Sequence, residues 1–212
     1  MAERLVSTAT RATATAGDHR SDALDERRGH SFAWAGYAAF VWAAAYAIGV
    51  RGYHGLGGTV GLAGEFEDPA RLRTASLIAG GGLLLAALAV LGLVRPWGLR
   101  LPRWPVIIMA LGGSIVAATH ALTAYVTKTL HLLGVIDLEF RGWARLDEAS
   151  LIRWDLLFYE PWFLALGVLV LLAALHHYGR TGGTERGQRR IVFAVLAGTV
   201  LWTAIASLQL GL

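Results

Sequence analysis

The sequence of 212 residues contains no cysteine. This absence excludes disulfide bonds, thiolate metal sites, cysteine nucleophiles and dithiol redox chemistry. Charged residues are also scarce, at 16% of the chain, whereas 55% of the residues are hydrophobic. A soluble globular protein could not keep that much apolar surface away from water, so we expect a membrane protein.

Charge is missing above all from five long apolar windows. A helix of about 20 residues, rising about 1.5 Å per residue, crosses the hydrocarbon core of a bilayer. Four windows contain no Asp, Glu, Lys or Arg, and the remaining one contains only Glu160. We therefore predict an all-α, polytopic transmembrane bundle of five helices in the cell membrane, forming one domain over residues 32–212. The expected spans are residues 32–50, 75–94, 105–126, 156–175 and 191–212.

The first 31 residues carry five arginines against five acids and no apolar run that could form a signal-peptide core. We expect residues 1–31 to form a disordered cytoplasmic tail. With this tail inside, 12 of the Arg and Lys residues fall in inside segments and seven in outside segments. Because positive charge is enriched on the cytoplasmic side of membranes, the sequence predicts an N-inside, C-outside orientation.

Three shorter patterns predict local structure. The glycines at residues 80–82 and 112–113, with the alanine repeats of the first span, indicate helices that approach closely. Gly55–Gly61 lacks the Gly-Lys-Ser/Thr of a phosphate loop, and we expect a tight re-entrant turn in which glycine supplies positive φ. Residues 135–153 carry apolar side chains at spacings of three to four, which favours a short helix in the membrane interface.

Glu160 points most directly to function. A carboxylate within an apolar window costs a few kcal/mol and is usually retained for a reason. Pro161 follows it, so we expect the helix to begin or to kink at this point. Glu160 would then lie at a helix mouth, where it could simply cap the exposed amides. If it instead lines a cavity, it could act as a general acid.

Aromatic residues are concentrated around this acid, and they make up five of the ten residues 154–163. On a helix, Trp154, Phe158 and Trp162 share one face. That face could meet lipid, or it could line a cavity and stabilise a cation formed on a substrate.

Other polar side chains are expected at the depth of Glu160. They could form a pocket that opens outward, or they could only hold the helices together through hydrogen bonds. The candidate catalytic residues are Glu160, Asp155 and His120, and the candidate substrate-binding residues are Trp42, Tyr46, His54, Phe158, Tyr159 and Trp162. We expect no metal and no cofactor, because the adjacent His176 and His177 would point about 100° apart on a helix.

Residues 53–62 (YHGLGGTVGL) and 160–164 (EPWFL) resemble a family of small multi-pass membrane proteins from high-GC bacteria whose function is uncharacterised. The resemblance implies a similar fold and transfers no catalytic residue. In its chemistry, an acid beside aromatic rings in a lipophilic site, the chain is also similar to membrane-bound terpene cyclases.

The sequence leaves three functions open. The first is an enzyme of the cyclase, isomerase or lyase kind, in which Glu160 protonates an isoprenoid-like substrate that enters from the lipid. The second is a protein that binds or transports a small ligand, coupled to protons. The third is a non-catalytic accessory subunit. Membrane lipids are the expected partners, nucleic acid is not expected, and oligomer formation stays open.

Overall fold

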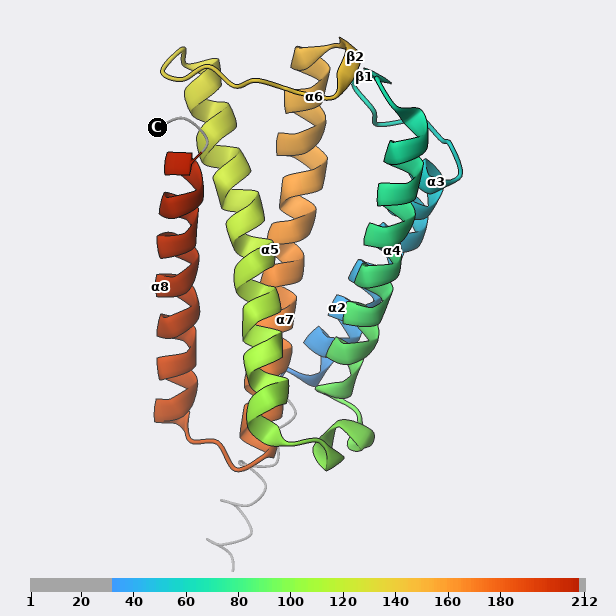
Figure 1. Ribbon diagram of the computed structural model, residues 1–212. Coiled ribbons are helices and arrows are strands. Elements are labelled where there is room, and N and C mark those ends of the chain that lie inside the picture. Colours follow the sequence, from blue (N-terminus) through green and yellow to red (C-terminus); the bar gives the residue numbers. More distant parts are fainter. Residues whose placement is uncertain (1–31, 210–212) are drawn as a thin grey trace, which may run out of the picture.

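The computed structural model describes residues 32–209, so the tail expected over residues 1–31 lies outside the described range. Five described helices are long and apolar enough to cross a membrane, as expected for a multi-pass membrane protein (Figure 1). They cover Ala33–Gly55, Pro69–Gly92, Arg103–Leu132, Glu148–Arg180 and Glu185–Gln209. Each of the five expected spans begins or ends several residues short of the corresponding helix, because a helix continues beyond its apolar window until a turn or cap ends it.

Two of the spanning helices contain a π-helical segment. The first consists of α2 (Ala33–Ala45), the π-helix η1 (Tyr46–Gly52) and α3 (Tyr53–Gly55). The fourth consists of α6 (Glu148–Trp154), the π-helix η3 (Asp155–Tyr159) and α7 (Glu160–Arg180). The others are α4 (Pro69–Gly92), α5 (Arg103–Leu132) and α8 (Glu185–Gln209), with the short 3₁₀ helix η2 (Pro96–Arg100) between α4 and α5.

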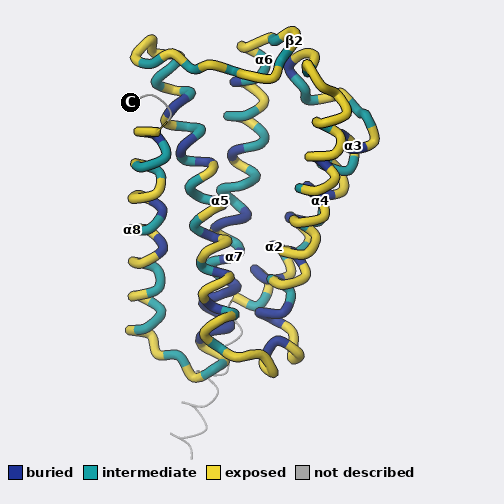
Figure 2. Tube along the Cα trace, in the orientation of Figure 1, coloured by how far each residue is buried: buried dark blue, intermediate teal, exposed yellow. Residues whose placement is uncertain are grey.

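Helix α7 lies at the centre of the bundle, in contact with α2, α5 and α8. Its core neighbours are small, including Ala39 and Ala43 of α2 and Ala110 of α5. Ser114 of α5 donates a hydrogen bond of 2.8 Å to the carbonyl oxygen of Gly167 in α7, which fixes these two helices at short range. Large apolar residues instead cover the outer faces of α4 and α8, as lipid contact requires (Figure 2).

The prediction that small residues mark helix contacts is confirmed in part. A Cβ atom at Gly80 would lie 3.2 Å from the carbonyl oxygen of Ala47, so this glycine allows α4 to approach η1. The glycines at residues 81–82 and 112–113 have nothing within 4 Å of a built Cβ atom. For these four glycines the prediction was wrong, because they lie on open faces of their helices.

The described residues are mostly helical, as predicted, and a small two-stranded sheet that was not predicted joins two connections at one end of the bundle. Strand β1 (Gly64–Phe66) pairs antiparallel with β2 (Trp143–Leu146), and the rings of Phe66 and Trp143 lie 3.9 Å apart. The expected interfacial helix over residues 135–153 was therefore wrong in its first part. Only α6 is helical there, starting after Asp147, whose side chain accepts a hydrogen bond from the backbone amide of Ser150.

The glycine-rich segment after the first span forms the expected turn. Gly57 has a φ of 95° and Gly61 a φ of 84°. A side chain at either position would be strained, because residues with a Cβ atom rarely adopt positive φ.

Glu160 does not lie at a helix mouth, which corrects the prediction drawn from Pro161. The backbone stays helical from α6 through α7, and η3 ends directly before Glu160. A proline inside a helix removes one hydrogen bond and crowds the carbonyl four residues earlier. The wider turn of the π-helix accommodates both effects, so the helix continues and Glu160 is not a cap.

Candidate functional site

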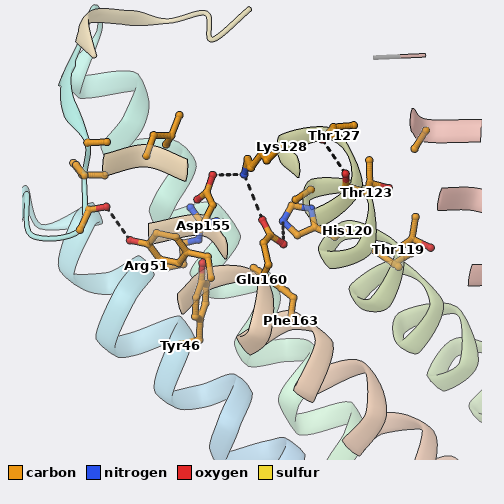
Figure 3. A pocket seen from close by; sticks show the side chains of 18 of the residues that line it. Tyr46, Arg51, Thr119, His120, Thr123, Thr127, Lys128, Asp155, Glu160 and Phe163 are labelled. Carbon is orange, nitrogen blue, oxygen red and sulfur yellow. Dashed lines mark hydrogen bonds and ion pairs between the residues drawn. The ribbon is translucent and has the colours of Figure 1, made fainter. Parts of the chain in front are cut away.

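A cavity of about 810 Å³ lies at the end of the bundle that carries the small sheet, and all five spanning helices contribute to its wall (Figure 3). Its volume falls in the range of small-molecule binding sites. Phe66 of β1 and Trp143 of β2 also line it. The sheet therefore closes one side of the cavity.

The two π-helices meet at this cavity. Tyr46 and Arg51 of η1 line it from one side, and Asp155 and Tyr159 of η3 line it from the other. The rings of Tyr46 and Tyr159 lie 6.2 Å apart in an edge-on contact. A π-helical turn changes the direction of side chains relative to the α-helix around it, and such turns are frequent at functional sites.

Glu160 lies on the wall of the cavity with only 3% of its surface exposed. Its Oε1 atom lies 3.8 Å from Nζ of Lys128, and its Oε2 atom lies 3.7 Å from Nε2 of His120. Oε2 has no hydrogen-bond partner. Figure 3 shows the carboxyl group pointing between Lys128 and His120. Buried polar atoms are nearly always hydrogen-bonded, so this unpartnered oxygen calls for an explanation.

Lys128 links Glu160 to a second carboxylate. Its ammonium group forms an ion pair with Asp155, and only 12% of the lysine side chain and 19% of the aspartate side chain are exposed. Asp155, Lys128, Glu160 and His120 thus form a continuous row of polar groups along the cavity wall. Arg51 adds a second cation to this wall.

The three candidate catalytic residues therefore lie together, and three of the six candidate substrate-binding residues join them. His54 contacts the carbonyl oxygen of Val60 through Nε2 at 3.0 Å. The hydroxyl of Tyr159 donates to the carbonyl oxygen of Gly61 at 3.2 Å. The residues brought together at the cavity are Glu160, Asp155, His120, Tyr46, His54 and Tyr159.

Trp42, Phe158 and Trp162 are not among the residues that line the cavity. Trp42 and Trp162 stack with ring centroids 4.2 Å apart, and each indole N–H donates to the backbone oxygen of the other residue. Phe158 contacts both Trp154 and Trp162, as the shared helix face predicts. The stacked indoles of Trp42 and Trp162 fasten α2 to α7, and the predicted role of these rings in binding a substrate stays a prediction.

Arg51 and Lys128 line the cavity, although the sequence did not identify either as a candidate site residue. Arg51 follows the first expected window directly, and Lys128 lies two residues past the third window. In both places the helical backbone continues and carries the charge onto the cavity wall. An Arg or Lys one or two residues beyond an apolar window was thus the sequence feature that could have identified these two cavity residues.

No group of three or more metal-binding side chains occurs among residues 32–209. His177 lies away from the cavity, near η2, and its Nδ1 atom contacts the carbonyl oxygen of Leu93 at 3.2 Å.

A family model described as a protein of unknown function (DUF3995) matches residues 41–170, which are 130 of the 212 residues. The matched range contains Lys128, Glu160 and the two segments that resemble an uncharacterised family, residues 53–62 and 160–164. No curated protein and no solved structure matches the chain.

Proposed function

We propose that this chain, which belongs to the DUF3995 family of proteins of unknown function, binds a lipophilic molecule with a neutral polar head group and exchanges a proton with it through Glu160. One observation carries the proposal: the Glu160 carboxyl group is buried on the wall of a cavity, and its Oε2 atom has no hydrogen-bond partner. Leaving a buried polar atom unpaired costs about 1–3 kcal/mol. A hydroxyl or carbonyl group of a ligand would supply the missing hydrogen bond.

The charges on the wall favour a neutral head group. Arg51 and Lys128 stand against Asp155 and Glu160, so cations and carboxylates are equal in number. An anionic or cationic ligand would leave one charge unbalanced in a largely apolar cavity, where uncompensated charge is costly. A lipophilic alcohol or ketone, such as an isoprenoid derivative, has both the neutral polar head group and the apolar body that this cavity favours.

Glu160 and His120 together can perform acid–base chemistry on such a ligand. The carboxylate of Glu160 would accept a proton from one ligand atom, and the proton would return to another ligand atom either from Glu160 or through the imidazole of His120, 3.7 Å from Oε2. One proton enters and one leaves, so the product is an isomer and no further reactant is needed. Asp155 would hold Lys128 in place beside Glu160.

This chemistry differs from that of a terpene cyclase in its charged intermediate. A cyclase of that kind forms a carbocation, whereas an isomerase that moves one proton between two ligand atoms leaves the net charge of the cavity unchanged.

Proton-coupled binding or transport is a second candidate, and the row of polar groups favours it. Asp155, Lys128, Glu160 and His120 follow one another at contact distances, as a path for protons requires. This function predicts ligand-dependent proton movement across a liposome membrane, which an isomerase would not cause. An accessory subunit, the third alternative, predicts neither isomerisation of a ligand nor ligand-dependent proton movement.

We also propose an N-inside, C-outside orientation in the cell membrane. It rests on the excess of Arg and Lys in the segments that precede α2 and connect α4 to α5 and α7 to α8. The cavity, at the opposite end of the bundle, would then lie toward the outer side.

The test compares Glu160→Gln with the unchanged protein in membranes incubated in heavy water. We expect mass spectrometry to detect deuterium in one class of neutral lipid with the unchanged protein only, because the amide of glutamine cannot donate a catalytic proton. Glu148→Gln is the matched control, since Glu148 contacts His131 outside the cavity wall. Equal lipid labelling with and without the Glu160 carboxyl group would contradict the proposal.

A further inference from the structure

We infer that the hydrocarbon chain of the ligand lies in a second, apolar cavity beside α4 and α5, so that the ligand is an amphiphile spread over two adjoining cavities. This inference rests on the proposed function of Glu160 and names the class of molecule that the site would take: a long-chain lipophilic alcohol or ketone.

The second cavity has a volume of about 610 Å³. It is lined by residues of α4 and α5, and residues of α2 and α7 complete the wall. Apart from His120, its lining side chains are apolar. They include Leu83, Val90, Val106, Met109, Val116 and Val170. Such a wall offers no hydrogen bonds, and it suits a hydrocarbon chain.

The two cavities adjoin, because Val116, His120 and Phe163 line both of them. The rings of His120 and Phe163 are in contact, with centroids 4.8 Å apart. Phe163 follows Glu160 by three residues on α7, so the two share one helix face. A polar group paired with Glu160 would therefore have its attached chain at the entrance to the apolar cavity.

The apolar cavity is accessible from the flank of the bundle. Met109 and Val116, which line it, are 71% and 69% exposed. Both belong to a helix long and apolar enough to span a membrane. A hydrocarbon chain could thus enter sideways from the lipid without leaving an apolar environment.

Gly113 offers a way to fill this cavity without disturbing the head-group site. It lines the apolar cavity and not the polar one, and a Cβ atom there meets nothing within 4 Å. In Gly113→Phe the ring would occupy space needed by the chain. Gly112→Phe is the matched control, because the neighbouring Gly112 is equally open but lines neither cavity.

The experiment measures binding of two neutral isoprenoid alcohols, geranylgeraniol and the shorter geraniol, to the purified full chain in nanodiscs. We expect Gly113→Phe to weaken geranylgeraniol binding about tenfold or more and to leave geraniol binding unchanged, because only the longer chain needs the apolar cavity. Gly112→Phe should bind both alcohols normally. Met109→Trp fills the same cavity from another position and should reproduce the selective loss. Glu160→Leu should weaken both alcohols.

The outcomes separate the two proposals. Normal geranylgeraniol binding by folded Gly113→Phe and Met109→Trp, with both alcohols still dependent on Glu160, would overturn the inference about the chain and leave the proposed function standing. Binding of neither alcohol by the unchanged protein, or equal binding by Glu160→Leu, would overturn the proposed function as well.

Discussion

Lys128 holds two carboxylates together, and its removal would leave them facing each other. Its ammonium group pairs with Asp155 and lies 3.8 Å from Oε1 of Glu160. We expect Lys128→Met to lower the free energy of unfolding by about 3–5 kcal/mol, because a largely buried charge loses its partner. Thermal unfolding in detergent would show this as a lower midpoint, and Lys128→Arg, which keeps the positive charge, should change it little.

A double variant distinguishes loss of the ion pair from loss of packing. Lys128→Met combined with Asp155→Leu removes both partners of the pair, so no uncompensated aspartate remains. We expect it to be more stable than Lys128→Met alone, which is a coupling between the two sites. If the double variant were less stable than the unchanged protein by the sum of the two single effects, the pair would have no energetic coupling.

Strands β1 and β2 depend on one glycine. Gly64 has a φ of 149°, and a Cβ atom there would clash with the backbone oxygen of Arg145 in the partner strand. We expect Gly64→Ala to open the sheet, which would speed hydrogen exchange at the amides of β1 and β2. Gly134→Ala is the control: Gly134 also has a positive φ, of 70°, but meets nothing within 4 Å. Unchanged exchange in Gly64→Ala would contradict the role given to this glycine.

The number of spanning helices could be predicted from the sequence, but their irregular parts could not. Windows of about 20 apolar residues identify a span through hydrophobicity alone, which is a property of composition. The π-helices η1 and η3 have no comparable signature. Pro161 indicated that regular α-helical hydrogen bonding is interrupted near Glu160. It did not indicate that a π-helical turn would accommodate the proline and let the helix continue. The small sheet was missed because its pairing joins segments far apart in the chain.

The sequence predicted the candidate site best for side chains whose closeness depends only on their depth in the bundle. Glu160 and His120 were expected at one level of the bundle, and they lie 3.7 Å apart. The rotation of each helix about its own axis was not predictable, because it depends on packing against neighbours. For that reason Trp42 and Trp162 stack on each other outside the cavity lining, whereas Lys128 lies on its wall.

The orientation of the whole bundle can be tested because the chain contains no cysteine. Single cysteines can be introduced at Asp137, whose side chain is fully exposed near the small sheet, and at exposed Arg186, at the start of α8. We expect an impermeant maleimide to label Asp137→Cys in intact cells and Arg186→Cys only after permeabilisation. The reverse pattern would place the cavity on the inner side of the membrane.

The proposed function requires a ligand that pairs with the buried carboxyl group of Glu160. An experimental structure of the full chain in nanodiscs with geranylgeraniol tests this most directly. We predict the ligand hydroxyl within hydrogen-bonding distance of Oε2 of Glu160, with the chain passing Phe163 toward Gly113. A structure in which Oε2 is paired with another side chain, and the alcohol lies only on the outer surface of the bundle, would contradict the account.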